Sequence, residues 1–279
     1  MSLTATQNYY NNVLFNTIAS IESMPFMPSW SKWVYKNELT IRDYTLISMY
    51  GLENPHSFKD YMKLPFVKLM EKNVHDTKKI SEEDYPFLVD DLYKEYLSTI
   101  LLNNKDNNKE KKAWVLMGLP ACGKSTYVNK ILSKESAAVL DADEMKKCEC
   151  LASFYKGGKG SESVRGIVDV AMNKVVSTVI DKGENVILSC VGYKMSSVEE
   201  RVSMLKNRGY NVTLVYVDIP TEVSAYRSLL RTLKDGRYVS LKYIFDCDRK
   251  PFNVFETIKA NNGMVGNYKV DDIVYYSNF

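Results

Sequence analysis

The sequence has few of the residues from which metal centres and disulfide frameworks are built. It contains two histidines and five cysteines, and no two of the cysteines form a Cys-x-x-Cys pair. An odd number of cysteines without paired motifs argues against both a zinc site and a set of structural disulfides. The composition is therefore typical of a protein whose thiols stay reduced.

Long apolar runs are also missing. No stretch approaches the roughly 18 consecutive apolar residues that a membrane-spanning helix needs. The first ten residues, Met-Ser-Leu-Thr-Ala-Thr-Gln-Asn-Tyr-Tyr, show neither the basic start nor the apolar core of a signal peptide. The sequence therefore predicts a cytoplasmic protein with no membrane partner.

Positively and negatively charged residues are nearly equal in number. The chain has 37 Lys and Arg against 34 Asp and Glu, a formal net charge of +3. This excess is too small to favour nucleic acid as a partner, although it leaves room for a local basic groove. Apolar residues make up 45% and charged residues 25% of the chain, which excludes wholesale disorder. The 279 residues suffice for one large domain or two smaller ones.

Residues 103–112 form the clearest break in composition, because none of the ten has an apolar side chain. Such a stretch cannot bury anything, so it predicts a solvated linker between residues 1–102 and residues 113–279. The first region is expected to be mainly helical and has no assigned role. Its last helix is indicated by apolar residues three and four positions apart, namely Tyr85, Leu88, Val89, Leu92, Tyr96 and Ile100.

Residues 113–279 alternate short apolar runs with amphipathic segments. This alternation predicts an α/β domain of the P-loop NTPase type, in which a parallel sheet is flanked by helices. Its active site is then expected at the carboxyl ends of the strands. The expected strands are residues 113–117, 137–141, 185–189, 211–217 and 271–276.

One motif carries the strongest functional signal. Residues 118–125, Gly-Leu-Pro-Ala-Cys-Gly-Lys-Ser, match G-x-x-x-x-G-K-[ST] between an expected strand and an expected helix. Backbone N–H groups of such a loop and the helix N-terminus bind phosphates. We expect Lys124 to contact the β- and γ-phosphates of ATP, and Ser125 to bind Mg²⁺. The predicted nucleotide-binding residues are Gly118, Leu119, Pro120, Ala121, Cys122, Gly123, Lys124, Ser125, Thr126 and, further along, Arg227.

Two carboxylates follow the second expected strand. Asp141 and Asp143 stand at the edge of the sheet where phosphoryl transfer to an alcohol needs a group that accepts or orients the hydroxyl proton. We predict Asp143 as this base and Asp141 as a helper or Mg²⁺ ligand. The alternative is an aspartate that caps the helix starting near Glu144, and the two roles are compatible.

A basic segment follows the fourth expected strand. Arg227 and Arg231 lie four residues apart on one expected helix face, and Gly236-Arg237 comes soon after. We predict that this segment is a mobile lid whose Arg231 and Arg237 stabilise charge on the transferring phosphoryl group, together with Lys124. The alternative is a solvated helix face.

Together these motifs resemble the zeta-toxin family of P-loop kinases and, more distantly, polynucleotide 5′-kinases. The resemblance runs from about Trp114 to Tyr276. It implies that Asp143 is the catalytic aspartate, that Lys124 is the phosphate lysine, and that Arg231 and Arg237 stabilise charge. Zeta toxins phosphorylate UDP-N-acetylglucosamine and are neutralised by a small helical antitoxin, so the resemblance also implies an antitoxin-like partner. The motifs that carry the resemblance are residues 118–126, Asp-x-Asp at 141–143, Gly-Glu-Asn-Val-Ile-Leu at 183–188, Asp-Ile-Pro-Thr-Glu at 218–222, Arg227, Arg231 and Gly-Arg at 236–237.

The chain departs from the family at the end of the third strand. Zeta toxins have Glu-Gly-Thr there, whose side chains hold the sugar, whereas this chain has Ser189-Cys190-Val191. A site that loses a carboxylate and a hydroxyl discriminates against the original substrate. We therefore expect an acceptor other than UDP-N-acetylglucosamine.

The sequence as a whole predicts an ATP- and Mg²⁺-dependent kinase that phosphorylates a hydroxyl group of a small molecule. A polynucleotide 5′-hydroxyl kinase is the first alternative, since those enzymes share the aspartate and the arginine lid. A second alternative is a toxin–antitoxin-type binding module in which residues 1–102 form a fused inhibitory region.

Overall fold

In the computed structural model the chain divides into two compact units. The structure describes residues 58–63, 67–68, 70–71, 80–81, 83–103, 110–155, 161–235 and 238–278. The sheet unit comprises Ile80–Ser153, Val164–Ile219 and Cys247–Phe279. The helical unit comprises Met1–Lys79, Phe154–Ser163 and Pro220–Asp246.

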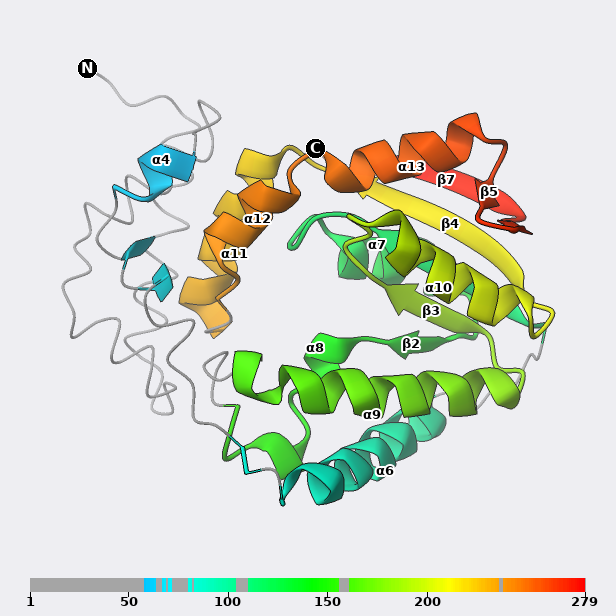
Figure 1. Cartoon of the computed structure of the whole chain (residues 1–279), viewed down its shortest axis with the longest axis horizontal. Helices are drawn as coiled ribbons and strands as arrows, with labels where there is room; N and C mark the ends of the chain where they lie inside the picture. Colours follow the sequence, from blue (N-terminus) through cyan, green and yellow to red (C-terminus); the bar gives the residue numbers. More distant parts are fainter. Residues whose placement is uncertain are drawn as a thin grey trace. The chain divides into compact units, whose positions relative to one another are not determined.

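A parallel sheet forms the centre of the sheet unit (Figure 1). Its five strands have the order β2-β3-β1-β4-β7, and every neighbouring pair is parallel. The apolar runs become buried strands because both faces of the sheet are covered, as in other parallel sheets. The five expected strands and the predicted fold class are confirmed. The strands are β1 (Lys112–Met117), β2 (Ala138–Leu140), β3 (Val186–Ser189), β4 (Asn211–Asp218) and β7 (Asp272–Ser277).

The register places the carboxyl ends of neighbouring strands, where the active site is expected, at the same edge of the sheet. Val115 of β1 pairs with Leu188 of β3 and with Leu214 of β4. The carboxyl ends of these three neighbouring strands therefore lie side by side. Because β1 is the middle strand of the five, the loop after it has strands on both sides.

Helices flank this sheet. The buried side chains of α9 are Val164, Ile167, Val168, Ala171, Val175, Val176, Val179 and Ile180. The helices of the sheet unit are α6 (Tyr85–Asn103), α7 (Lys124–Ile131), α8 (Ala142–Met145), the 3-10 turn η1 (Glu149–Leu151), α9 (Ser161–Asp181), α10 (Met195–Lys206) and α13 (Lys250–Ala260). A small antiparallel pair, β5 (Met264–Val265) and β6 (Tyr268–Lys269), completes the unit. No described helix combines the length and apolarity of a membrane span.

Helix α6 belongs with the sheet. Its apolar face is buried as the periodicity predicts, by Val89, Leu92, Tyr96 and Ile100. The helix lies beside α9 and contacts β2 (Figure 1). The sheet unit therefore begins at Ile80, before the expected linker at residues 103–112. This division of the chain is not the one predicted from the sequence. The predicted linker at residues 103–112 stays a prediction. Residues 1–57 and 104–109 lie outside the described residues.

The described part of the helical unit joins residues that precede the sheet in the chain to residues between β4 and β7. It contains α4 (Phe58–Tyr61), α11 (Thr221–Asp235) and most of α12 (Leu241–Cys247). The Tyr61 hydroxyl donates to the carbonyl oxygen of Glu222 at 3.3 Å. Glu71 accepts hydrogen bonds from the Tyr238 hydroxyl at 2.5 Å and from the Leu241 N–H at 2.6 Å.

Candidate active site

The loop after β1 has the backbone that phosphate binding requires. Gly118 has φ of +149°, and a Cβ atom there would lie 2.5 Å from the carbonyl oxygen of Val217, so only glycine fits. The Gly118 N–H donates to the carbonyl oxygen of Val191, which ties the loop to the end of β3. Gly123, at φ +100°, is the N-cap of α7. The predicted loop therefore runs directly into a helix N-terminus, where N–H groups and the helix dipole favour anions.

Lys124 is the first residue of α7, and its side chain lies across the loop. Its Nζ atom donates to the carbonyl oxygens of Gly118 at 2.8 Å and Leu119 at 2.9 Å. Ser125 and Thr126 are exposed in the same first turn, whereas Leu119 and Cys122 are buried. The loop thus offers a cation, two hydroxyl groups and backbone N–H groups, and the thiol of Cys122 packs inside.

Asn278 contacts this loop, although no sequence motif predicts it. Its Nδ2 atom donates to the carbonyl oxygen of Cys122 at 2.8 Å, although 156 positions separate the two residues. Asn278 directly follows β7, and β4 lies between β7 and β1. The contact depends on the order of strands in the sheet, for which a single sequence has no local signal.

The two carboxylates after β2 have different partners. Asp141 is the N-cap of α8, and its Oδ1 atom accepts the N–H of Asp143 at 2.8 Å. Asp143 does not cap the helix. Its Oδ1 atom lies 3.2 Å from Nζ of Lys146, and 38% of its side chain is exposed. The Asp141 side chain therefore caps the helix, as the alternative interpretation expected of one aspartate. The Asp143 carboxylate instead is partly exposed and pairs with Lys146.

Strand β3 ends at Ser189 and is followed by Cys190 and Val191, which bring a thiol and an apolar side chain to its carboxyl end. The Cys190 N–H donates to the carbonyl oxygen of Leu116 at 2.8 Å, so this segment runs along the end of β1. Burial raises the pKa of the Cys190 thiol, and the charges of Arg201 and Lys124 offset this only in part. The thiol is therefore neutral near pH 7, which argues against a nucleophilic cysteine.

A third carboxylate, Asp218, stands at the end of β4. It is 9% exposed and accepts hydrogen bonds from the hydroxyls of Tyr216 at 3.1 Å and Tyr275 at 2.5 Å. The hydrogen bond to Asp218 raises the pKa of Tyr275 to about 12, so this tyrosine remains a donor near pH 7. These hydrogen bonds join β4 to β7. Asp218, the first residue of the 218–222 motif, therefore has a structural role in the packing of the sheet.

The predicted lid arginines lie in the other unit. Arg227 and Arg231 are half-buried residues of α11, one turn apart. They belong to the helical unit and the phosphate loop to the sheet unit, so their approach to the loop stays a prediction. Arg237 and Gly236 lie outside the described residues. Tyr238, the next residue, is bonded to Glu71, and its burial beside that carboxylate raises the pKa of its hydroxyl.

Comparisons with known proteins identify a family and a shared fold. The family model described as Zeta toxin matches residues 97–278. The solved PezAT chromosomal toxin–antitoxin system of Streptococcus pneumoniae is 18% identical, with a TM-score of 0.52, over 72% of this chain and 80% of that one. The complex AvrRxo1-ORF1:-ORF2 with ATP is 16% identical, with a TM-score of 0.54, over 83% of this chain and 72% of that one. At these identities the two structures show a shared fold. No curated protein matches the chain.

Proposed function

The chain belongs to the zeta toxin family, and we propose from this that it is a kinase that transfers the γ-phosphoryl group of ATP to a hydroxyl group of a small molecule. Membership of this family supports a kinase-like function. The observation that supports the proposal best is the phosphate loop, in which Lys124 begins α7 and lies across the glycine-bounded turn after β1.

The loop residues fit ATP and Mg²⁺ by the chemistry of their groups. The N–H groups at the start of α7 and Lys124 would hold the β- and γ-phosphates. The exposed hydroxyl of Ser125 would hold Mg²⁺, with Asp141 as a second ligand. When bound, the metal neutralises charge on the phosphate oxygens. Among the residues that the structure describes, no group of three His, Cys, Asp or Glu could hold a metal ion.

The remaining residues divide the chemistry of transfer. We assign Asp143 to the acceptor hydroxyl, because a carboxylate there orients the nucleophile and takes its proton. We assign Arg231 and Arg237 to the charge that develops on the phosphoryl oxygens, and Arg227 to the nucleotide. These four roles rest on the sequence pattern and on the family, with the exposure of Asp143 in their favour.

We propose an acceptor other than UDP-N-acetylglucosamine. The neutral thiol of Cys190 and the side chain of Val191 stand where family members hold the sugar with polar groups. A polynucleotide 5′-hydroxyl remains the alternative, and the small net charge of +3 does not favour it. We also propose a cytoplasmic location, which the odd number of cysteines without paired motifs supports.

We also propose an antitoxin-like protein partner. PezAT is a toxin–antitoxin system, and AvrRxo1-ORF1 was solved in complex with ORF2. The alternative of a non-catalytic module, inhibited by residues 1–102, has less support because α6 packs into the sheet unit with four buried side chains. Removing residues 1–109 would expose that packing, so the full chain is the sample to test.

A screen of ATP consumption tests the proposed function. The full chain is incubated with ATP and Mg²⁺ and with nucleotide sugars, nucleosides, 5′-hydroxyl oligonucleotides or water alone. Stimulation by a small hydroxyl compound supports the proposal, and stimulation by oligonucleotides alone supports the polynucleotide alternative. No ATP consumption under any condition would contradict a kinase.

Lys124→Ala is expected to lower turnover by about 10²–10³-fold, the usual effect of removing one preorganised donor to a transition state. ATP affinity should fall less, because charge grows on the phosphoryl group during transfer. Lys130→Ala is the matched control, since Lys130 is an exposed lysine of the same helix, in its last turn. Wild-type turnover of Lys124→Ala with the same acceptor would rule out the assigned role of the loop.

A further inference from the structure

We propose that Glu95 and Tyr96 of α6 are positioning residues for the reaction, because they hold residues 141–150, the segment that carries Asp141 and Asp143. The inference rests on the proposed function, in which Asp143 acts on the acceptor hydroxyl. It gives α6 a part in catalysis that its place before the expected linker does not suggest.

Tyr96 holds the start of the segment. Its side chain is 4% exposed, and its hydroxyl accepts the N–H of Asp141 at 3.0 Å and donates to the carbonyl oxygen of Asp141 at 3.2 Å. One phenol thus binds both backbone groups of the residue that leaves β2 and caps α8. Burial and the nearby charges of Asp141 and Glu144 raise the pKa of Tyr96 to about 12, so the phenol keeps its proton near pH 7.

Glu95, the preceding residue of α6, holds the other end. Its two carboxylate oxygens accept the N–H groups of Glu149 at 2.6 Å and Cys150 at 3.2 Å, where η1 begins. Burial opposes the charge of Glu95, but these two donors lower its pKa, so Glu95 is ionised near pH 7. Burial and the Glu95 charge raise the pKa values of the Cys148 and Cys150 thiols to about 12, which leaves both thiols neutral.

The segment between these two anchors needs external support. Its only α-helix, α8, has four residues, whereas an isolated helix needs about 12–15 to be even marginally stable in water. The side-chain cap of Asp141 and the ion pair of Asp143 with Lys146 are both contacts within the segment. Adjacent residues of a 19-residue helix thus tie both ends of the segment to α6, and the fully buried side chain of Met145 packs its middle.

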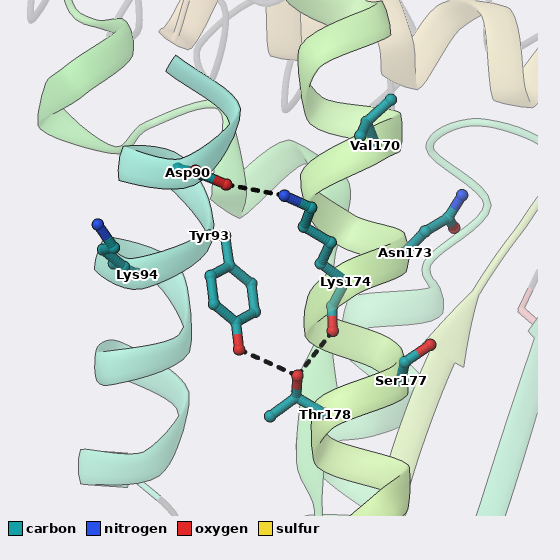
Figure 2. A pocket seen from close by; sticks show the side chains of 8 residues that line it. All are labelled: Asp90, Tyr93, Lys94, Val170, Asn173, Lys174, Ser177 and Thr178. Atoms are coloured by element: carbon teal, nitrogen blue, oxygen red, sulfur yellow. Dashed lines mark hydrogen bonds and ion pairs between the residues drawn. The ribbon is translucent and has the colours of Figure 1, made fainter. Parts of the chain in front are cut away.

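Tyr93 provides a matched control on the same helix. Its hydroxyl lies 3.1 Å from Oγ1 of Thr178, and one turn before it Asp90 pairs with Lys174 at 2.7 Å (Figure 2). These residues line a surface hollow of about 740 Å³ between α6 and α9. Tyr93→Phe thus removes one phenol hydroxyl that binds α9, and Tyr96→Phe removes one that binds the 141–150 segment.

The test compares both phenylalanine variants of the full chain. Turnover is measured with whichever acceptor gives the highest ATP consumption in the screen, water included. We expect Tyr96→Phe to lower kcat by about 10–100-fold, because a small misplacement of a reacting group has effects of this size. ATP affinity and the kcat of Tyr93→Phe should stay within about twofold of wild type. Equal kcat values for the two variants would overturn the inference.

A double-mutant cycle with Asp143→Asn separates positioning from a general loss of structure. If Tyr96 acts through Asp143, Tyr96→Phe should change kcat by less than about twofold in the Asp143→Asn background. A full additional loss there would assign Tyr96 a merely structural role. Faster amide hydrogen exchange at residues 141–147 in Tyr96→Phe, and not in Tyr93→Phe, is the expected readout besides activity.

Glu95 gives a graded second test. Glu95→Gln keeps one acceptor oxygen, and Glu95→Ala keeps none, so we expect kcat to fall in the order wild type, Gln, Ala. Two failures can be told apart. If Asp143→Asn itself keeps wild-type turnover, the role of Asp143 fails and the inference fails with it. If Asp143→Asn is inactive while the Tyr96 and Glu95 variants stay active, the inference alone fails.

Discussion

Arg231→Ala is expected to lower turnover by about 10³–10⁵-fold, the range found for arginines that stabilise a transferring phosphoryl group. Such an arginine stabilises the charge distribution of the transition state more than that of bound ATP, so the loss should appear in kcat with little change in ATP affinity. Arg231→Lys should recover only part of the activity, because a lysine keeps the charge but not the planar pair of donors. Arg237→Ala is expected to behave in the same way.

Arg227→Ala is the comparison within the same helix. Arg227 lies one turn before Arg231 on α11, and both side chains are half-buried. We expect its loss to weaken ATP binding more than it slows transfer, since we assign it to the nucleotide. The measurements are a nucleotide titration and steady-state kinetics on each variant. If Arg231→Ala lost ATP affinity and turnover equally, Arg231 would be a ground-state ligand and the lid hypothesis would be wrong.

Asp143→Asn is expected to lower turnover by about 10²–10⁴-fold, the usual contribution of a positioned general base. Asparagine has the same size but cannot take the hydroxyl proton. The free energy of unfolding should stay within about 1 kcal/mol of wild type, because the Asp143 carboxylate is 38% exposed and asparagine can still accept a hydrogen bond from Lys146. ATP affinity should be retained because the phosphate loop is untouched.

Asp141 gives the complementary result. Asp141→Ala removes the oxygen that caps α8 and is expected to destabilise the fold by about 0.5–2 kcal/mol. Asp141→Asn keeps the cap, so a higher Mg²⁺ requirement in that variant would point to metal binding. Thermal unfolding and Mg²⁺-dependent turnover are measured for all three variants. Normal turnover with lowered stability in Asp143→Asn would assign Asp143 to the fold and make Asp141 the better candidate for the base.

Much of the fold could be predicted because its signals are local. Each buried parallel strand is a short apolar run, and the phosphate loop has its glycines at fixed positions between a strand and a helix. The burial of α6 also followed from residues three and four positions apart. Which surface covers that buried face could not be predicted, because apolar periodicity identifies a face and not its partner.

The site could be predicted only in part. The pattern found Asp141 and Asp143 but could not tell the cap from the open carboxylate, since that depends on side-chain orientation within one turn. It found no role for Tyr96 or Asn278, whose partners lie 45 and 156 positions away. Contacts of that length depend on how the strands and helices pack.

The parallel sheet, the phosphate loop and the kinase family could thus be read from the chain alone, because strand burial and phosphate binding require particular residues at short, fixed spacings. Three features required the folded molecule: α6 joins the sheet unit, Tyr96 binds both backbone groups of Asp141, and Asn278 reaches the loop after β1. The last two contacts satisfy backbone groups that are left over at the ends of strands and short helices. Which side chain reaches such a group is set by strand order and helix packing, and many sequences can supply it.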